Sequence, residues 1–197
     1  MIDASPWDLP ALRAGWRGAT PFPHLVFDGV LDEEELAAVR QGVAAEPHWP
    51  DFGELHHFAG SAPSLQQPTL QRLEAALGAP ELLAAVAAVT GHLVRRVEAR
   101  SYVYVPGSYL LPHTDCNPER AVSFALYLSP REGCEGGELE LFGATTEEGE
   151  IVATAPAVTI DPLPGRLVLL DVSPLSLHQV REVLAGHRAS IAGWLLR

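Results

Sequence analysis

The sequence of 197 residues contains no lysine, and all 13 of its basic side chains are arginines. Without a side-chain primary amine, a Schiff-base nucleophile, a pyridoxal phosphate anchor and the phosphate-binding lysine of a P-loop are all excluded. Any anion bound by a cationic side chain must therefore be held by arginine or by protonated histidine.

Acidic side chains outnumber basic ones: 25 carboxylates against 13 arginines give a formal net charge of −12. This balance opposes attraction to a phosphate backbone, so we expect no nucleic-acid partner. No apolar run approaches the ~20 residues of a membrane-spanning helix, and the acidic first dozen residues do not resemble a secretory signal. The two cysteines, Cys116 and Cys134, lack CxxC spacing. We therefore expect a cytoplasmic protein with free thiols and no membrane partner.

The pattern of residue types changes once along the chain. Its length suits one domain of residues 1–197. Residues 1–91 predict helical support: helices follow the N-cap Asp32 and start at Pro68 and Pro80. A short strand is expected at 25–27, before the first of these helices, and an irregular aromatic loop at 48–63. In residues 92–197, short strands alternate with glycine and proline turns. The expected strands are 93–105, 121–128, 138–142, 151–160, 166–172, 177–183 and 188–196. This pattern predicts a mainly β fold, a jelly-roll barrel buttressed by N-terminal helices.

The segment Pro-His-Thr-Asp at 112–115 carries the first chemical signal. In an extended chain His113 and Asp115 project to the same face, so both can bind one metal ion. His178 lies on a later expected strand, and Arg188 opens the last one. Alternation along that last strand places Arg188, Ser190, Ala192 and Trp194 on one face. An inward-facing arginine in an apolar barrel requires an anion. Two histidines and one carboxylate leave three coordination positions open, the arrangement of non-haem Fe(II) oxygenases.

Taken in order, these motifs resemble the Fe(II)/2-oxoglutarate-dependent dioxygenases, and within them the prolyl-hydroxylase-like group. The matching segments, about half of the chain, are Tyr104–Gly107, His113–Asp115, 121–129, Gly136–Leu139, His178, Arg188–Ser190 and Gly193–Trp194. The resemblance implies a double-stranded β-helix, the cupin-like form of the jelly roll.

The resemblance also implies a role for each candidate residue. The iron ligands are His113, Asp115 and His178. Arg188 binds the distal carboxylate of 2-oxoglutarate, assisted by the Ser190 hydroxyl, and two tyrosines, Tyr104 and Tyr127, contact this co-substrate. The implied cofactors are Fe(II), 2-oxoglutarate and O2, with ascorbate as reductant. Collagen-type relatives use lysine for that carboxylate, so the lysine-free chain is closer to the arginine-using branch.

The implied reaction is hydroxylation of an unactivated C–H bond with formation of succinate and CO2. The leading substrate is a prolyl residue in a peptide or protein. A free amino acid or small metabolite remains an alternative, as does a cupin-like metal protein that does not use 2-oxoglutarate. Substrate choice is expected in the Trp49–Ser64 loop and in the turn at 129–137. In the loop, His56 and His57 are candidates to touch the substrate at the barrel mouth.

Overall fold

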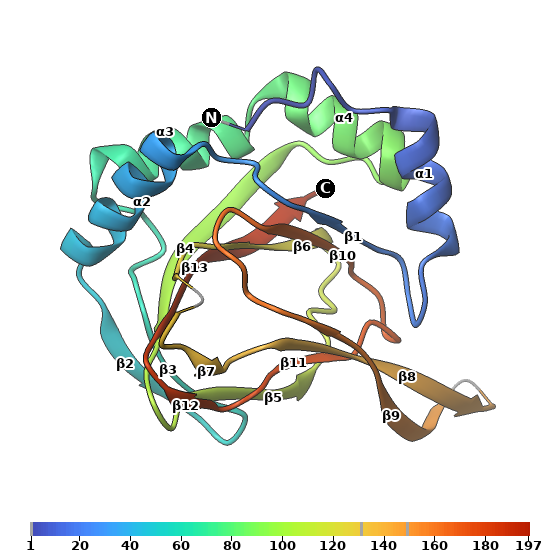
Figure 1. Ribbon diagram of the computed structural model, residues 1–197. Helices are drawn as coiled ribbons and strands as arrows, with labels where there is room; N and C mark the ends of the chain where they lie inside the picture. The colour runs from blue at the N-terminus through green and yellow to red at the C-terminus, as the bar shows by residue number, and fades with distance from the viewer. Residues whose placement is uncertain (1, 131, 149) are drawn as a thin grey trace.

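A computed structural model describes residues 2–130, 132–148 and 150–197. Eleven strands form one antiparallel sheet that curls on itself in the order β1-β10-β6-β13-β4-β3-β5-β11-β8-β9, with β2 paired to β3 (Figure 1). A second, two-stranded sheet pairs β7 with β12. The strands are β1 (His24–Phe27), β2 (Trp49–Phe52), β3 (His56–Gly60), β4 (Arg96–Tyr104), β5 (Tyr109–His113), β6 (Arg120–Tyr127), β7 (Glu135–Gly136), β8 (Leu139–Glu147), β9 (Glu150–Ile160), β10 (Leu167–Asp171), β11 (His178–Val180), β12 (Val183–Ala185) and β13 (Arg188–Leu196).

The helices begin at signals that the sequence carries. They are α1 (Leu9–Gly18), α2 (Glu33–Ala45), α3 (Pro68–Leu77) and α4 (Pro80–Thr90). The Asp32 carboxylate accepts a hydrogen bond from the Glu35 amide at 2.8 Å, and the Glu35 carboxylate accepts one from the Asp32 amide at 3.3 Å, which together cap α2. Gly91 ends α4 with φ of 81°. The three predicted helices are confirmed, whereas α1, capped by Asp8, was missed.

All four helices lie against one outer face of the curled sheet, beside β1, β10, β6, β13 and β4 (Figure 1). Alternation along the central strands separates this helix-facing core from the barrel interior. Leu126 and Ile191, both fully buried, pack in the helix-facing core. Burial of each such side chain stabilises the fold by about 1.5–3 kcal/mol. Tyr127 and Ser190, one position away, line the interior. The predicted mainly β barrel with flanking helices is therefore confirmed.

Three strands of the main sheet come from before residue 92. The strand β1 lies where a short strand was expected at 25–27, whereas β2 and β3 were not expected. The segment 48–63, expected to be irregular, contains the hairpin of β2 and β3. β3 pairs with β4 and β5, and such partners distant in sequence leave no local signal. The expected strand 177–183 is divided into β11 and β12.

No single helix in the ranges given above is long and apolar enough to cross a membrane. One pair, α3 and α4, passes by length and composition when taken together, with a bend of 45° between the two helices.

Candidate metal centre

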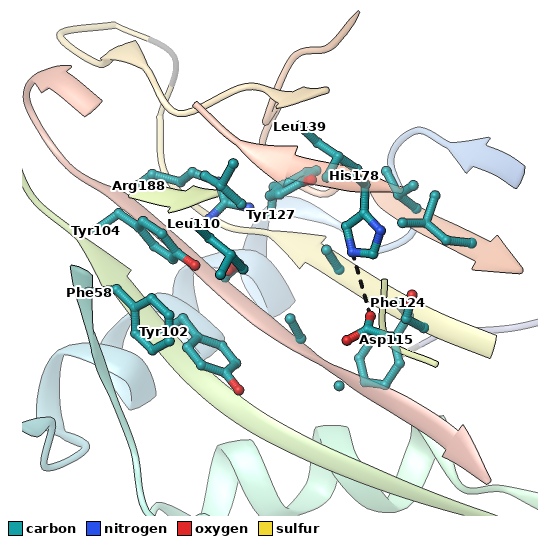
Figure 2. Close-up of a pocket in the computed structure, with 18 of the residues that line it drawn as sticks. Phe58, Tyr102, Tyr104, Leu110, Asp115, Phe124, Tyr127, Leu139, His178 and Arg188 are labelled. Carbon is teal, nitrogen blue, oxygen red and sulfur yellow. Dashed lines mark ion pairs between the residues drawn. The ribbon is translucent and has the colours of Figure 1, made fainter. Parts of the chain in front are cut away.

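Three of the predicted residues meet where β5 and β11 run side by side. His113 and His178 are register partners in this ladder, and their ring centroids are 4.4 Å apart. Asp115 follows two residues after β5 ends. Its Oδ1 atom lies 3.9 Å from Nε2 of His113, and its Oδ2 atom lies 3.5 Å from Nε2 of His178. One candidate ligand atom from each residue lies within 4.8 Å of the other two, and Figure 2 shows His178 directed at Asp115.

Each imidazole is oriented by a backbone carbonyl two residues earlier in the chain. Nδ1 of His113 is 2.9 Å from the Leu111 carbonyl oxygen, and Nδ1 of His178 is 2.9 Å from that of Ser176. A carbonyl oxygen can only accept, so each Nδ1 donates its proton. In the neutral rings this leaves the Nε2 lone pairs free to bind a metal ion at the shared centre.

The electrostatics of the cluster favour metal-binding protonation states. Burial lowers the pKa of His113 below its usual value, and the neighbouring His178 lowers it further, so the ring is held neutral. Burial alone raises the pKa of Asp115. The contacts with His178 and His113, together with the nearby Trp194 indole, outweigh that effect and bring the pKa down to about 2. The carboxylate is therefore ionised at neutral pH.

The opposite end of the same cavity holds a buried cation. Arg188 is 3% exposed, and its guanidinium carbon lies 4.7 Å from the ring centroid of Tyr104 and 4.9 Å from that of Tyr127. Within the described parts of the chain no carboxylate forms an ion pair with it. Figure 2 shows Arg188 and Tyr104 at the end of the pocket away from Asp115, with Tyr127 between Arg188 and His178. Burial raises the pKa of both tyrosines, which keeps them protonated as hydrogen-bond donors.

Several polar atoms around this cation are buried without a hydrogen-bond partner among the described residues. They are Nε of Arg188, the hydroxyl of Tyr127 and Oγ of Ser190. Orphaned buried donors are rare in folded proteins, and three in one place indicate a site built for a group from outside the chain. Because arginine carries a positive charge and tyrosine and serine can donate, that group is an anion with several acceptor oxygens.

A single cavity of about 220 Å³ joins the two ends, and all seven predicted site residues line it. They are His113, Asp115, His178, Arg188, Tyr104, Tyr127 and Ser190. The expected common face of Arg188, Ser190 and Trp194 on the last strand is also confirmed, since all three line the cavity. Of the two histidines suspected at the mouth, His56 lines the cavity and His57 does not.

Sequence reasoning overlooked other residues of this site. Trp194 lines the cavity, and the signal that could have indicated this role is its place on the same face of the last strand as Arg188. Phe58, Tyr102 and Leu110 form an apolar wall, and they come from three different strands. Arg120 lies 3.6 Å from the Asp115 carboxylate. No pattern in the sequence distinguishes it from the other arginines.

The donor set can be tested against the groups it could hold. Two imidazoles and one carboxylate match Fe(II) in oxygenase sites, and they leave positions open for other ligands. The orphaned donors at the Arg188 end fit a carboxylate. A small molecule that ligates the metal and carries a second carboxylate would satisfy both ends of the cavity. The residues present therefore fit Fe(II) and 2-oxoglutarate.

Comparison with known sequences gives matches to one enzyme family. Residues 99–196 match the 2OG-Fe(II) oxygenase superfamily. The chain is 30% identical over 196 residues to the prolyl 3,4-dihydroxylase OGFOD1 of Ostreococcus tauri, with 88% of this chain and 38% of that protein covered. It is 29% identical over 186 residues to the prolyl 3-hydroxylase sudestada1 of Drosophila melanogaster, with 88% and 34% covered. The chain thus spans little more than a third of the length of these curated relatives.

A solved structure extends the likeness to the whole fold. The crystal structure of a Pseudomonas putida prolyl-4-hydroxylase superposes with a TM-score of 0.70 at 22% sequence identity, covering 94% of this chain and 98% of that one. The match includes the helices as well as the barrel. The chain belongs to the 2OG-Fe(II) oxygenase superfamily, whose cofactors are Fe(II), 2-oxoglutarate and O2.

Proposed function

We propose that this chain is an Fe(II)- and 2-oxoglutarate-dependent dioxygenase that hydroxylates a prolyl residue in a peptide or protein. The observation that carries the proposal is the two-ended cavity, with the His113, Asp115 and His178 cluster at one end and the unpaired cation of Arg188 at the other. The curated relatives, which are named as prolyl hydroxylases, support the choice of substrate.

In this proposal Nε2 of His113, a carboxylate oxygen of Asp115 and Nε2 of His178 hold the iron. When bound, Fe(II) supplies the coupling of O2 reduction and 2-oxoglutarate decarboxylation to oxidation of the C–H bond. The protein needs no general base for this reaction. Its side chains hold the reacting groups in place and keep bulk water out of the cavity.

Arg188 has the task of binding the distal carboxylate of 2-oxoglutarate. Its planar guanidinium presents two parallel N–H donors, which match the two oxygens of a carboxylate. The rings of Tyr104 and Tyr127 hold the guanidinium in one orientation, and the hydroxyls of Tyr127 and Ser190 are further donors. The charge is already desolvated, so binding an anion relieves an existing penalty.

The cavity mouth suits a compact aliphatic substrate. Phe58, Tyr102 and Leu110 give it an apolar wall, and His56 contributes the main polar edge from the β2–β3 hairpin. A pyrrolidine ring can fill this space with its C–H bonds directed inward. The flanking peptide then lies outside, across the exposed Trp49 and the hairpin.

The test is production of succinate from 2-oxoglutarate with Fe(II) and ascorbate, across proline-containing peptides, matched peptides with alanine in place of proline, and free proline. We expect turnover that requires both Fe(II) and peptidyl proline, with one oxygen atom added to the peptide by mass spectrometry. Arg188→Ala should abolish the 2-oxoglutarate-dependent turnover, whereas Arg181→Ala, at an exposed arginine, should not.

Each alternative has its own outcome in this assay. Stimulation by free proline alone would replace the peptide substrate with a free amino acid. Equal stimulation by the alanine peptides would rule out prolyl hydroxylation. An activity that Arg188→Ala leaves independent of 2-oxoglutarate would instead indicate a cupin-like metal protein.

A further inference from the structure

The carboxylate of the metal cluster is the one candidate ligand that no strand holds in place. His113 ends β5 and His178 begins β11, so their positions follow from the paired ladder. Asp115 lies in the connection between β5 and β6, outside both strands. Its side chain is nevertheless only 13% exposed. Some other contact must fix its orientation.

Besides the two candidate histidine ligands and the nearby Trp194 indole, Arg120, the first residue of β6, contacts Asp115. Its Nη1 atom lies 3.3 Å from the Asp115 carbonyl oxygen, to which it donates a hydrogen bond, and 3.6 Å from Oδ1 of the same residue. One guanidinium nitrogen thus contacts both the backbone and the side chain of Asp115. Because β6 is a central strand of the sheet, Arg120 is itself anchored.

The guanidinium of Arg120 is held from the other side by an aromatic ring. Its carbon lies 3.5 Å from the ring centroid of Trp194, which projects from the neighbouring strand β13. A cation stacked at this distance on an indole is attracted to the ring face and restrained to its plane. The chain of contacts therefore runs from the sheet through Trp194 and Arg120 to Asp115.

We infer that Arg120, stacked on Trp194, is a positioning residue for the metal-binding carboxylate of Asp115. The inference rests on the proposed metal centre. With Oδ1 held toward Arg120, Oδ2 on the His178 side is left to bind the metal ion. A carboxylate that binds through one oxygen preserves the open positions that a co-substrate and O2 require.

The arrangement completes a pattern across the three ligands. Each imidazole is oriented by a backbone carbonyl, and the carboxylate is oriented by Arg120. Such partners of metal ligands change metal affinity by about 10- to 100-fold when they are removed. The guanidinium is also a positive charge close to a cation site, and through charge alone it would weaken metal binding. Positioning and repulsion therefore predict opposite effects of removing it.

The experiment measures the Kd for Co(II) by calorimetry, without co-substrate, together with the visible absorption of the bound cobalt, which reports its coordination. We expect Arg120→Met to weaken Co(II) binding by about 10- to 100-fold and to change the cobalt spectrum. Arg120→Lys should not restore the affinity, because a compact ammonium cannot stack flat on Trp194 while contacting both oxygens. The matched control is Arg96→Met, at an exposed arginine that contacts only Glu98 and Glu119 among the described carboxylates. It should leave both readouts unchanged.

The possible outcomes distinguish a failure of the positioning role of Arg120 from a failure of the proposed metal centre. An unchanged or tighter Kd in Arg120→Met, with an unchanged spectrum, would overturn the positioning role while leaving the metal centre intact. If Arg120→Met does not fold, Arg120→Lys is the deciding variant. A positioning role predicts that it binds Co(II) more weakly than the unsubstituted chain, whereas a role of charge alone predicts unchanged binding. If the unsubstituted chain binds no Co(II), or if His178→Ala binds it equally well, the proposed metal centre itself is wrong.

Discussion

Replacement of Arg188 by methionine should separate stability from co-substrate binding. The guanidinium is 3% exposed and unpaired among the described carboxylates, and its Nε has no partner there. Removing it loses two cation–π contacts, with Tyr104 and Tyr127, worth together about 2–4 kcal/mol. It also removes a desolvation penalty of several kcal/mol for a buried ion. Methionine fills a similar space, so the free energy of unfolding should stay within about 2 kcal/mol of its original value.

The effect of the same substitution on 2-oxoglutarate binding should be far larger. Two charge-assisted hydrogen bonds to the distal carboxylate, each worth about 1.5–3 kcal/mol, sum to about 3–6 kcal/mol. At about 1.4 kcal/mol for each factor of ten, the Kd rises by roughly 10²- to 10⁴-fold. Calorimetric titration of 2-oxoglutarate into the Mn(II)-loaded chain measures the Kd, and urea unfolding of the metal-free chain measures stability. Arg181→Met is the exposed control.

The reverse pattern would refute this reasoning. A loss of about 3–5 kcal/mol on unfolding is what breaking a buried ion pair produces. If Arg188→Met shows that loss while its Kd for 2-oxoglutarate stays near that of the unsubstituted chain, Arg188 is a structural residue and the anion site lies elsewhere.

Three further predictions concern the scaffold. Glu46→Ala should lower the free energy of unfolding in urea by about 2–4 kcal/mol, because the buried carboxylate accepts the amides of residues 66 and 67; a change under about 1 kcal/mol would contradict this. Gly193→Ala should lower the free energy of unfolding by about 1–3 kcal/mol in the same assay, because the added Cβ would meet a backbone oxygen at 1.9 Å. Gly143→Ala, whose added Cβ has its nearest atom at 3.9 Å, is the control and should be near neutral. Equal effects of the two substitutions would contradict the prediction. Burial lowers the pKa of His48 below 6.5, so the unfolded chain binds more protons than the folded one as the pH falls, and the free energy of unfolding decreases. His48→Gln should make the free energy of unfolding less dependent on pH between about pH 7.5 and 5.5. An unaltered pH dependence would contradict this prediction.

Sequence signals that act over a few residues predicted some parts of the fold. The capping residue Asp32 and the first-turn prolines Pro68 and Pro80 gave helices where expected, because these signals act within one turn of chain. Alternation along the last strand placed Arg188 and Ser190 on one inward face. Strand periodicity is likewise a local property.

Other features depended on contacts that a local pattern does not contain. The hairpin of β2 and β3 has mixed polar and aromatic residues, and its strands form because β3 finds open partners in β4 and β5. The helix α1 was missed although Asp8 and Pro10 are ordinary start signals. The role of Arg120 follows only from the closure of the barrel, which brings β6, β13 and the connection after β5 together. The grouping of His113, Asp115 and His178 was predictable because their motif order matched that of a known family.

The position of β13 has a consequence for how this molecule can change. The strand is hydrogen-bonded to β4 along one edge and to β6 along the other, and it carries Arg188 at its start and Trp194 near its end. Its amides can exchange with solvent only when the middle of the sheet opens, so the strand that carries Arg188 belongs to the most protected part of the sheet. In the hairpin, β3 pairs with β4 and β5 inside the main sheet, whereas β2 pairs with β3 at its margin and leaves Trp49 and Phe52 exposed. Substitutions in β2 can therefore change the surface beside the cavity mouth without altering the strands that carry Arg188 and the candidate metal ligands.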